Sequence, residues 1–317
     1  MKLENIGFYT LSNYRARQTS VKSPLWRCEL LLTNKCNFHC PYCRGLAGQD
    51  ISFDEAKHIL GYWFDGGLRN VRFSGGEPTL YKRLPELVSL CRDTGVKRIA
   101  VSTNGSADIA YYEQLLNAGV NDFSISLDAC CSADGDVMTG TQGSWERVVK
   151  NIKLLSKQTY VTIGMVYNEL NERRIKETIQ YAHSLGVADI RVIPSAQYGN
   201  KMSFDVNEGI LDVHPILKYR LSGSRNVRGI GSNDCHICKL VLDDMAIWNG
   251  YHYPCIIYLR EYGKPIGKVS ENMRQERYEW YLNHNSFNDP ICRTNCLDVC
   301  VEYNNYANPY HNHKKNT

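Results

Sequence analysis

The sequence lacks long apolar runs and strong segregation of charge. None of its hydrophobic stretches reaches the roughly 18 residues that a membrane-spanning helix needs. The net charge is only +4, and like charges do not gather into the blocks that mark nucleic-acid binding. No apolar signal core follows the N-terminus. These absences predict a cytoplasmic protein that binds neither membranes nor nucleic acids.

Cysteine, in contrast, is abundant, with 13 residues in a chain of 317. An odd number without an export signal argues against a disulfide framework, and clustered cysteines in a reducing compartment more often bind metal. Seven cysteines lie in the first 131 residues and six between residues 235 and 300. The gap between the two groups predicts two separate cysteine sites.

From about residue 26, short β-rich runs alternate with helical patterns. Such alternation predicts an α/β fold in which a parallel sheet curves into a partial (β/α)6 TIM-like barrel. Ligands of such sheets bind at the carboxyl ends of the strands. The predicted strands are Trp26–Leu32, Asn70–Phe73, Arg98–Ser102, Asp122–Leu127, Thr159–Tyr167 and Asp189–Ile193. The predicted helices are Ser52–Phe64, Leu84–Thr94, Asp108–Asn117, Ser144–Ser156 and Glu172–Leu185.

This rhythm breaks after Pro194, which predicts three parts. Residues 1–198 are expected to form the barrel, and residues 199–234 a glycine-containing bridge with one helix near Leu211–Leu221. Residues 235–317 form a cysteine-rich region that is too short to build a large core unaided. A bound metal would supply the missing stability of that region.

The segment Cys36-Asn37-Phe38-His39-Cys40-Pro41-Tyr42-Cys43 directly follows the first predicted strand. Three thiolates this close can hold three irons of a 4Fe–4S cluster. The fourth iron then lacks a protein ligand and stays open to a small chelating molecule. The alternative is a zinc site in which His39 completes the three cysteines.

The spacing Cys-x3-Cys-x2-Cys, with an aromatic residue before the last cysteine, resembles the signature of the radical S-adenosylmethionine (SAM) superfamily over roughly residues 26–195. The resemblance implies that Cys36, Cys40 and Cys43 ligate a 4Fe–4S cluster, that SAM chelates the open iron, and that Tyr42 lies beside the adenine. It also implies reductive cleavage of SAM to a 5′-deoxyadenosyl radical, which abstracts hydrogen from a substrate. A flavodoxin- or ferredoxin-type donor would supply the electron.

A second motif, Ser74-Gly75-Gly76-Glu77-Pro78, follows the second predicted strand. Its glycines would let the backbone approach a ligand closely, and Glu77 would attract an ammonium group. The matching motif of the superfamily binds the amino group of SAM, which makes Gly75, Gly76, Glu77 and Pro78 candidate contacts. The alternative is an ordinary turn at a strand end.

Later strand ends carry weaker candidates. By position in the superfamily, Ser126, Asn168 and Ile193 are expected to contact SAM, and Asp128 the substrate. Satisfied hydroxyls and turn formers are the alternative for each. None of these residues is assigned as a nucleophile or another catalytic group. The remaining cysteines of the first group are expected to be buried small apolar residues: Cys28, Cys91, Cys130 and Cys131.

The second cysteine group resembles the C-terminal SPASM or twitch extension of radical SAM enzymes, which holds auxiliary clusters. Its six cysteines are too few for two fully ligated clusters, and a Cys-x2-Cys-x5-Cys element is missing. One auxiliary 4Fe–4S cluster is therefore expected. Its predicted ligands are Cys238, Cys255, Cys292 and Cys296. Cys235 and Cys300 remain open, and zinc with His236 or His252 is the alternative.

These motifs predict a radical SAM enzyme that epimerises or dehydrogenates a small polar substrate, such as a sugar, aminoglycoside or nucleoside. The alternative is a maturase of a ribosomally made peptide. Such maturases often carry an N-terminal recognition domain, and about 25 residues precede the first predicted strand. A non-catalytic zinc or cluster module would leave the Gly75–Pro78 motif unexplained.

Overall fold

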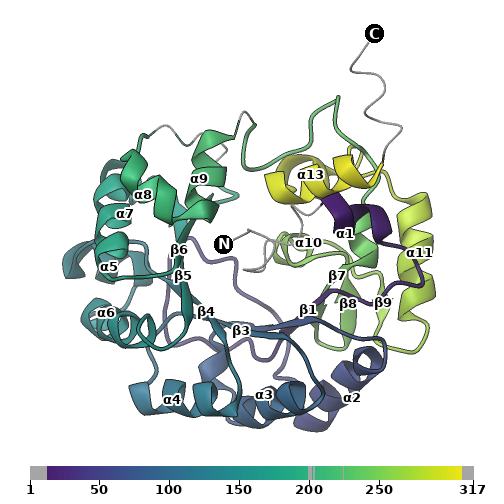
Figure 1. Cartoon of the computed structure of the whole chain (residues 1–317), viewed down its shortest axis with the longest axis horizontal. Coiled ribbons are helices and arrows are strands. Elements are labelled where there is room, and N and C mark those ends of the chain that lie inside the picture. Colours follow the sequence, from purple (N-terminus) through teal and green to yellow (C-terminus); the bar gives the residue numbers. More distant parts are fainter. Residues whose placement is uncertain (1–12, 199–201, 203, 224, 309–317) are drawn as a thin grey trace. The chain divides into compact units, whose positions relative to one another are not determined.

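The computed structural model describes residues 13–198, 202, 204–223 and 225–308. Within them, helices alternate with the strands of one sheet, whose order is β6-β5-β4-β3-β2-β1-β7-β8-β9 (Figure 1). None of the described helices is long and apolar enough to cross a membrane.

All six predicted strands are present. They are β1 (Arg27–Leu31), β2 (Asn70–Ser74), β3 (Arg98–Thr103), β4 (Asp122–Ser126), β5 (Tyr160–Tyr167) and β6 (Asp189–Pro194). The predicted helices correspond to α2 (Phe53–Phe64), α3 (Leu84–Asp93), α4 (Ile109–Ala118), α6 (Ser144–Leu155) and, after a short 3-10 turn η4 (Glu172–Arg174), α7 (Ile175–Ser184). At the start of α2, the Ser52 side chain accepts a hydrogen bond from the Glu55 backbone N–H, as expected of a helix cap. The α/β prediction is therefore confirmed.

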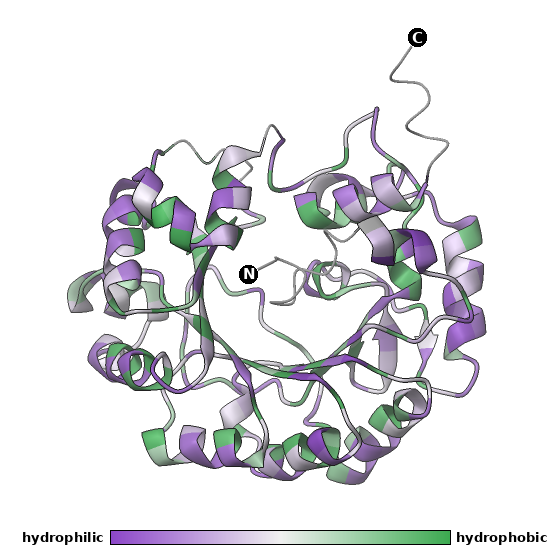
Figure 2. Ribbon diagram, in the orientation of Figure 1, coloured by the Kyte–Doolittle hydropathy of each residue, from purple (hydrophilic) through white to green (hydrophobic). Residues whose placement is uncertain are grey.

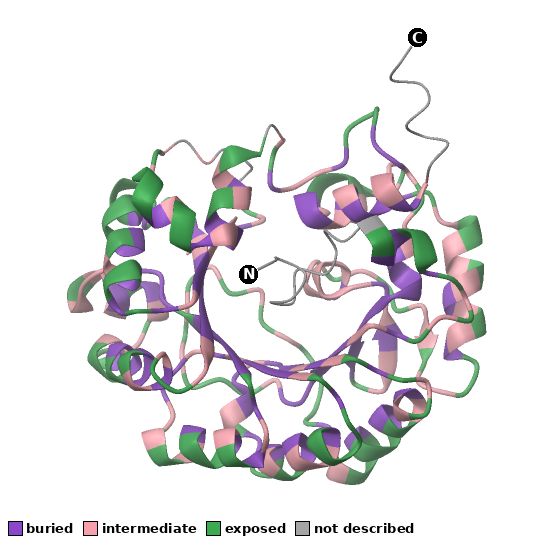
Figure 3. Ribbon diagram, viewed as in Figure 1, coloured by how far each residue is buried: buried purple, intermediate pink, exposed green. Residues whose placement is uncertain are grey.

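The chain divides by its contacts into two units. One comprises residues 32–47 and 73–227 and contains β3 to β6, which pair in parallel as neighbours. These strands are largely buried (Figure 3), and the helices of this unit mix hydrophilic and hydrophobic residues (Figure 2). Because parallel neighbours end at the same edge, the residues after β3, β4, β5 and β6 are brought together.

Sequence reasoning did not predict α5 (Ser132–Thr139). Its sequence contains Gly135, a poor helix former, which hides the helical pattern. The glycine is needed for packing, since a Cβ there would lie 2.4 Å from the Trp145 ring. Between residues 204 and 223, two short helices replace the single predicted one: α8 (Glu208–Val213) and α9 (Pro215–Ser222).

The other unit comprises residues 1–31, 48–72 and 228–317. Here β7 (Asp244–Trp248) pairs in parallel with β1 and antiparallel with β8 (Tyr251–Tyr253), which pairs with β9 (Gly267–Lys268). Besides α2 and the start of β2, this unit contains α1 (Asn13–Gln18), η5 (Lys239–Leu242), α10 (Ile256–Arg260), α11 (Met273–Asn283), α12 (Pro290–Asn295) and α13 (Asp298–Ala307). The predicted division at residues 198 and 234 stays a prediction.

Arg277 of α11 fastens the strand region of this second unit. Although charged residues are rarely buried, Arg277 is only 2% exposed. It donates to the carbonyls of Val241 (2.8 Å) and Tyr253 (3.0 Å), and also to that of Asp244. Burial lowers the pKa of Arg277 to about 10, while Asp244 opposes that shift. One cation thus satisfies backbone acceptors on both sides of the β7–β8 hairpin.

Replacing Arg277 with methionine should therefore destabilise the protein by about 3 kcal/mol or more, because several buried carbonyls lose their donor. Denaturant unfolding of Arg277→Met is compared with that of Lys268→Met, an exposed control on β9. Equal stability of the two variants would mean that the hairpin does not depend on this guanidinium.

Candidate functional site

The Cys36–Cys43 loop presents its thiols at the surface. Cys36 and Cys43 are exposed and Cys40 is partly buried. Backbone N–H groups already point at two of the sulfur atoms, from Phe38 to Cys36 (3.5 Å) and from Gly45 to Cys43 (3.3 Å). Such donors stabilise the thiolate form and tune metal-bound sulfur. The local geometry therefore suits a thiolate-ligated cluster.

Two backbone hydrogen bonds fix the segment that leads into this loop. The N–H of Gly76 donates to Thr33 O and the N–H of Glu77 to Lys35 O, both at 2.7 Å. A Cβ on Gly76 would lie 2.2 Å from Lys35 O, and one on Gly75 would lie 2.4 Å from Thr33 O. The two glycines therefore allow two backbone segments of the chain to approach each other closely. Sequence reasoning had instead explained them by the close approach of a ligand.

The Glu77 carboxylate is fully buried and is held by donors of the chain itself. Its Oε1 accepts from the hydroxyls of Thr79 and Thr103, both at 2.7 Å, and from the Thr79 N–H at 3.0 Å. Its Oε2 accepts from the Asn104 N–H at 2.6 Å. Burial raises the pKa of Glu77, and these donors oppose the rise. Glu77 also caps the short turn η3 (Pro78–Leu80), whose first residue Pro78 is buried.

Through Glu77, the glycine turn is joined to the loop after β3 and from there to the cysteines. The Asn104 amide donates to Asn37 Oδ1 (2.9 Å) and lies 3.8 Å from Cys36 Sγ. The Asn37 amide donates in turn to Ser106 Oγ at 2.8 Å. Sequence reasoning missed Asn104, although its position after the third strand was the available signal.

Tyr42 and Asp128 tie the cysteine loop to the end of β4. The Tyr42 hydroxyl donates to Asp128 Oδ2, and Asp128 Oδ1 accepts from the Val166 N–H at 2.6 Å. Burial raises the pKa of Asp128 to about 6, and it also raises that of Tyr42. Both side chains expected to contact ligands are therefore engaged with each other.

The other predicted contacts differ in exposure. Ser126 ends β4 and is exposed, whereas Ile193 of β6 is half-buried. Asn168 follows β5 and is 1% exposed. Its Oδ1 accepts from the Leu170 N–H, but its buried Nδ2 has no partner among the described residues. That donor is a free hydrogen-bonding group at the strand ends.

A second gathering of thiols lies in the other unit. Burial raises the pKa of Cys238 to about 12, and nearby Cys300 and Cys235 raise it further. Burial also raises the pKa of Cys255, with contributions from Cys300 and Cys238. Burial raises the pKa of Cys292 as well, with contributions from Cys255 and Cys238. The four predicted ligand thiols and Cys300 are therefore close enough to influence one another's pKa.

Cys300 is the addition to that predicted set. Its interaction with Cys296 is a thiol–thiol hydrogen bond, the largest cause of the raised pKa of Cys296. Cys235 is turned towards its own loop, since its Sγ donates to Ile237 O at 3.4 Å. These thiols are partly buried and crowded, so each is costly to ionise alone, and a bound metal removes their protons. The donor set fits a metal centre.

The histidines proposed for a zinc site are occupied elsewhere. His252 Nε2 bonds to Glu276 at 2.7 Å, and His236 stacks on Phe287. His284, which sequence reasoning missed, has its Nε2 3.8 Å from Cys292 Sγ. His284 follows the last residue of α11, and the direction of that helix brings it to Cys292. The spacing of residues in the sequence does not predict this contact.

The prediction for the other four cysteines is half right. Cys28 and Cys91 are buried, as expected of small apolar side chains. Cys130 and Cys131 are only partly buried, so that interpretation of them is wrong. They precede α5, the helix that the sequence did not reveal.

A Glu77 variant distinguishes a structural role of this carboxylate from a role in binding SAM. Glu77→Gln replaces one carboxylate oxygen by an amide NH2, which would face an N–H or O–H donor of the chain. The variant should therefore lower the free energy of unfolding by about 1.5–3 kcal/mol. Thermal unfolding and SAM binding of this variant are compared with those of Glu113→Gln, an exposed control on α4. Full stability combined with weakened SAM binding would instead assign the carboxylate to the ligand.

Comparison with known proteins identifies one domain of the chain. A model of the Radical SAM superfamily matches residues 30–182. A probable GTP 3′,8-cyclase of Metallosphaera sedula is 28% identical over 196 residues, which are 59% of this chain and 61% of that protein. One of Sulfolobus acidocaldarius is 29% identical over 170 residues, 52% and 54% of the two chains. The matched part thus spans less than two thirds of these relatives.

Solved structures show the same fold. Streptococcus suis SuiB bound to S-adenosylmethionine superposes with a TM-score of 0.58 at 18% identity, covering 86% of this chain and 67% of that one. Native anSMEcpe with bound AdoMet gives 0.60 at 14% identity, covering 92% and 99%. These likenesses confirm the partial-barrel fold, and the cysteine-rich C-terminal region fits a SPASM- or twitch-like domain. Residues 30–182 are thus a domain of the Radical SAM superfamily, which marks the chain as an enzyme that binds a 4Fe–4S cluster and SAM.

Proposed function

We propose that Cys36, Cys40 and Cys43 hold the SAM-binding 4Fe–4S cluster and that the enzyme starts radical chemistry there on a small polar substrate. The observation that carries this proposal is the exposed three-thiol loop, with N–H groups already directed at Cys36 and Cys43. When both cofactors are bound, one electron from the cluster cleaves SAM reductively and creates the radical that removes a substrate hydrogen.

The residues around the loop position the cofactors. The Gly75–Pro78 turn would offer backbone carbonyls to the SAM ammonium, since the Glu77 carboxylate is occupied by four donors. The unpartnered Nδ2 of Asn168 would donate to SAM, and Ser126 would offer its exposed hydroxyl. Ile193 and the Tyr42 ring would supply apolar contacts. Tyr42, held by Asp128, also keeps the loop in place.

A nucleotide or another small polar molecule is the substrate class we favour. The curated relatives are named probable GTP 3′,8-cyclases, and GTP belongs to this class. A peptide is the second candidate, because solved structures of the same fold include SuiB with the precursor peptide SuiA. Transfer of deuterium into 5′-deoxyadenosine from labelled GTP, or from a labelled peptide, distinguishes the two classes.

The second cysteine group completes the proposal. Cys238, Cys255, Cys292 and Cys296 would ligate one auxiliary 4Fe–4S cluster, and the effects of these partly buried thiols on one another's pKa support that assignment. A flavodoxin- or ferredoxin-type protein would supply electrons. Thiolate-bound clusters are suited to a reducing compartment, so a cytoplasmic location is part of the proposal.

The SAM assignment predicts turnover without substrate. Anaerobically reconstituted protein with a low-potential reductant should convert SAM to 5′-deoxyadenosine and methionine, as measured by chromatography. Cys36→Ala, Cys40→Ala and Cys43→Ala should each abolish the reaction, because each removes a cluster ligand. Cys91→Ala, at a buried cysteine outside both sites, is the matched control. Wild-type turnover in any of the three loop variants would refute the ligand set.

The two-cluster assignment predicts about eight irons per reconstituted chain. Replacing Cys36, Cys40 and Cys43 together should leave about four irons and no SAM cleavage. Replacing Cys255 and Cys296 should also leave about four irons, but SAM cleavage should persist. Elemental analysis decides the matter: zinc at the C-terminal cysteines, with only about four irons in the intact chain, would exclude the auxiliary cluster.

A further inference from the structure

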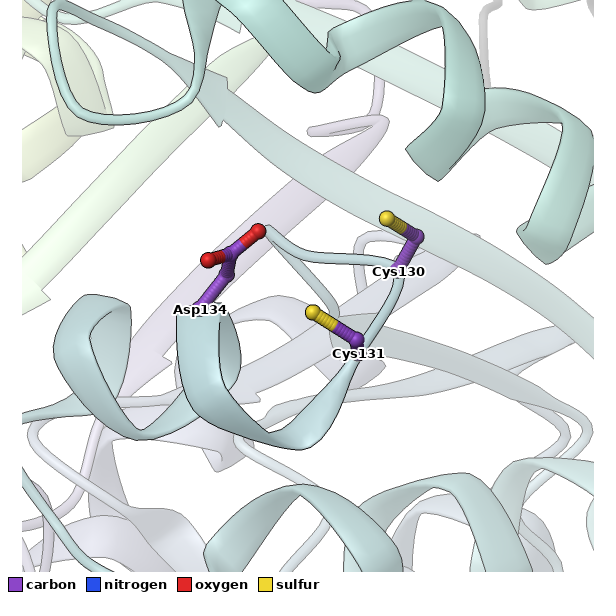
Figure 4. A group of neighbouring side chains, drawn as sticks. All are labelled: Cys130, Cys131 and Asp134. Atoms are coloured by element: carbon purple, nitrogen blue, oxygen red, sulfur yellow. The ribbon is translucent and has the colours of Figure 1, made fainter.

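Cys130, Cys131 and Asp134 form a group of potential metal ligands outside both cofactor sites. The two sulfur atoms and a carboxylate oxygen all lie within 4.8 Å of one another. Figure 4 shows both sulfur atoms pointing to the side on which the Asp134 carboxylate lies. All three residues are partly buried, so the group is neither sealed in the core nor spread over the surface.

The local structure explains why these side chains converge. Cys131 is the residue before the first turn of α5, and Asp134 lies three positions later. Side chains at these two positions of a helix lie next to each other, as in a capping box. The segment before Cys130 is held in place, since Trp145 Nε1 donates to Ala129 O at 3.0 Å and Asn171 Nδ2 donates to Asp128 O at 3.2 Å.

A cation already occupies this group. The Arg174 guanidinium donates to Cys131 Sγ at 3.2 Å and to an Asp134 oxygen at 2.5 Å. Its Nε donates to Glu177 Oε2 at 2.6 Å, and the same Glu177 oxygen lies 3.7 Å from Cys130 Sγ. Two thiols and two carboxylates therefore surround one positive charge. The Arg174 side chain is 45% exposed, so it can swing into solvent.

The donor set selects the kind of ion. Thiolates favour zinc and softer ions, whereas magnesium and calcium take oxygen ligands. Tetrahedral zinc with Zn–S distances of about 2.3 Å sets its sulfur ligands roughly 3.8 Å apart. The two sulfur atoms lie within 4.8 Å of each other, so they need to approach by about 1 Å at most. The Glu177 carboxylate, 3.7 Å from Cys130 Sγ, is available for the fourth position once Arg174 leaves.

We propose that Cys130, Cys131, Asp134 and Glu177 form a site for a zinc-class divalent cation, for which Arg174 is the intrinsic competitor. Metal binding displaces the guanidinium and releases the thiol protons. The site is independent of the proposed SAM chemistry, because none of its residues belongs to either predicted cluster.

The test is zinc binding by cluster-reconstituted protein. The protein is dialysed against zinc buffered by a chelator near neutral pH, and zinc and iron are both measured per chain. About one zinc ion is expected at this site. It should be lost in the Cys130→Ser/Cys131→Ser double variant, with iron unchanged, and retained in Cys91→Ser. Asp134→Asn should weaken it about tenfold or more.

Zinc binding by Arg174→Ala is the decisive measurement, because misfolding of a variant would not increase its affinity for zinc. Without the competing guanidinium, zinc should bind about tenfold tighter or better. The proposal is overturned if wild-type protein takes up no zinc beyond its cluster sites. It is equally overturned if the double cysteine variant binds zinc as wild type does, or if Arg174→Ala does not tighten binding.

Discussion

The conformation of the cysteine loop depends on how closely two neighbouring strand ends approach. The Gly76 and Glu77 N–H groups bond to the carbonyls of Thr33 and Lys35, directly before Cys36. Only glycine fits there, because a Cβ on Gly76 would lie 2.2 Å from Lys35 O. The buried Glu77 carboxylate extends the same connection to Asn104, whose amide reaches the loop itself. The motif that resembles a ligand site thus also supports the loop proposed to hold the cluster.

The two groups of cysteines differ in their surroundings. The thiols of the first loop are exposed or partly buried, and backbone N–H groups donate to two of them. In the proposed cluster, a small chelating molecule would reach the open iron from this surface. The thiols of the second group are crowded, and burial raises the pKa of Cys238 and Cys255. Metal ligation there would contribute folding energy to a region of short helices and strands.

Much of the fold followed from local patterns. The six strands are buried apolar runs, and the Ser52 cap marks the start of α2, so periodicity and capping were sufficient. The helix α5 was missed because Gly135 serves tertiary packing against Trp145 rather than helix formation. Local sequence carries no signal for such a contact.

The site was predictable in its cysteines and less so in its supports. The spacing of Cys36, Cys40 and Cys43 is encoded within eight residues, whereas Glu77 accepts hydrogen bonds from Thr103 and Asn104 at the end of another strand, β3. Tyr42 and Asp128 were each named, but their bond joins residues 86 positions apart. His284 reaches Cys292 through the end of a helix. Side chains that the topology of the fold brings together cannot be predicted from the spacing of residues in the sequence.

Mössbauer spectroscopy of reconstituted protein, recorded with and without SAM, tests the central claim most directly. If Cys36, Cys40 and Cys43 leave one iron open to SAM, addition of SAM should shift the signal of a single iron site and leave the auxiliary cluster unchanged. The shift should be absent when these three cysteines are replaced and present when Cys255 and Cys296 are replaced. A spectrum that does not respond to SAM in the intact protein would contradict the account.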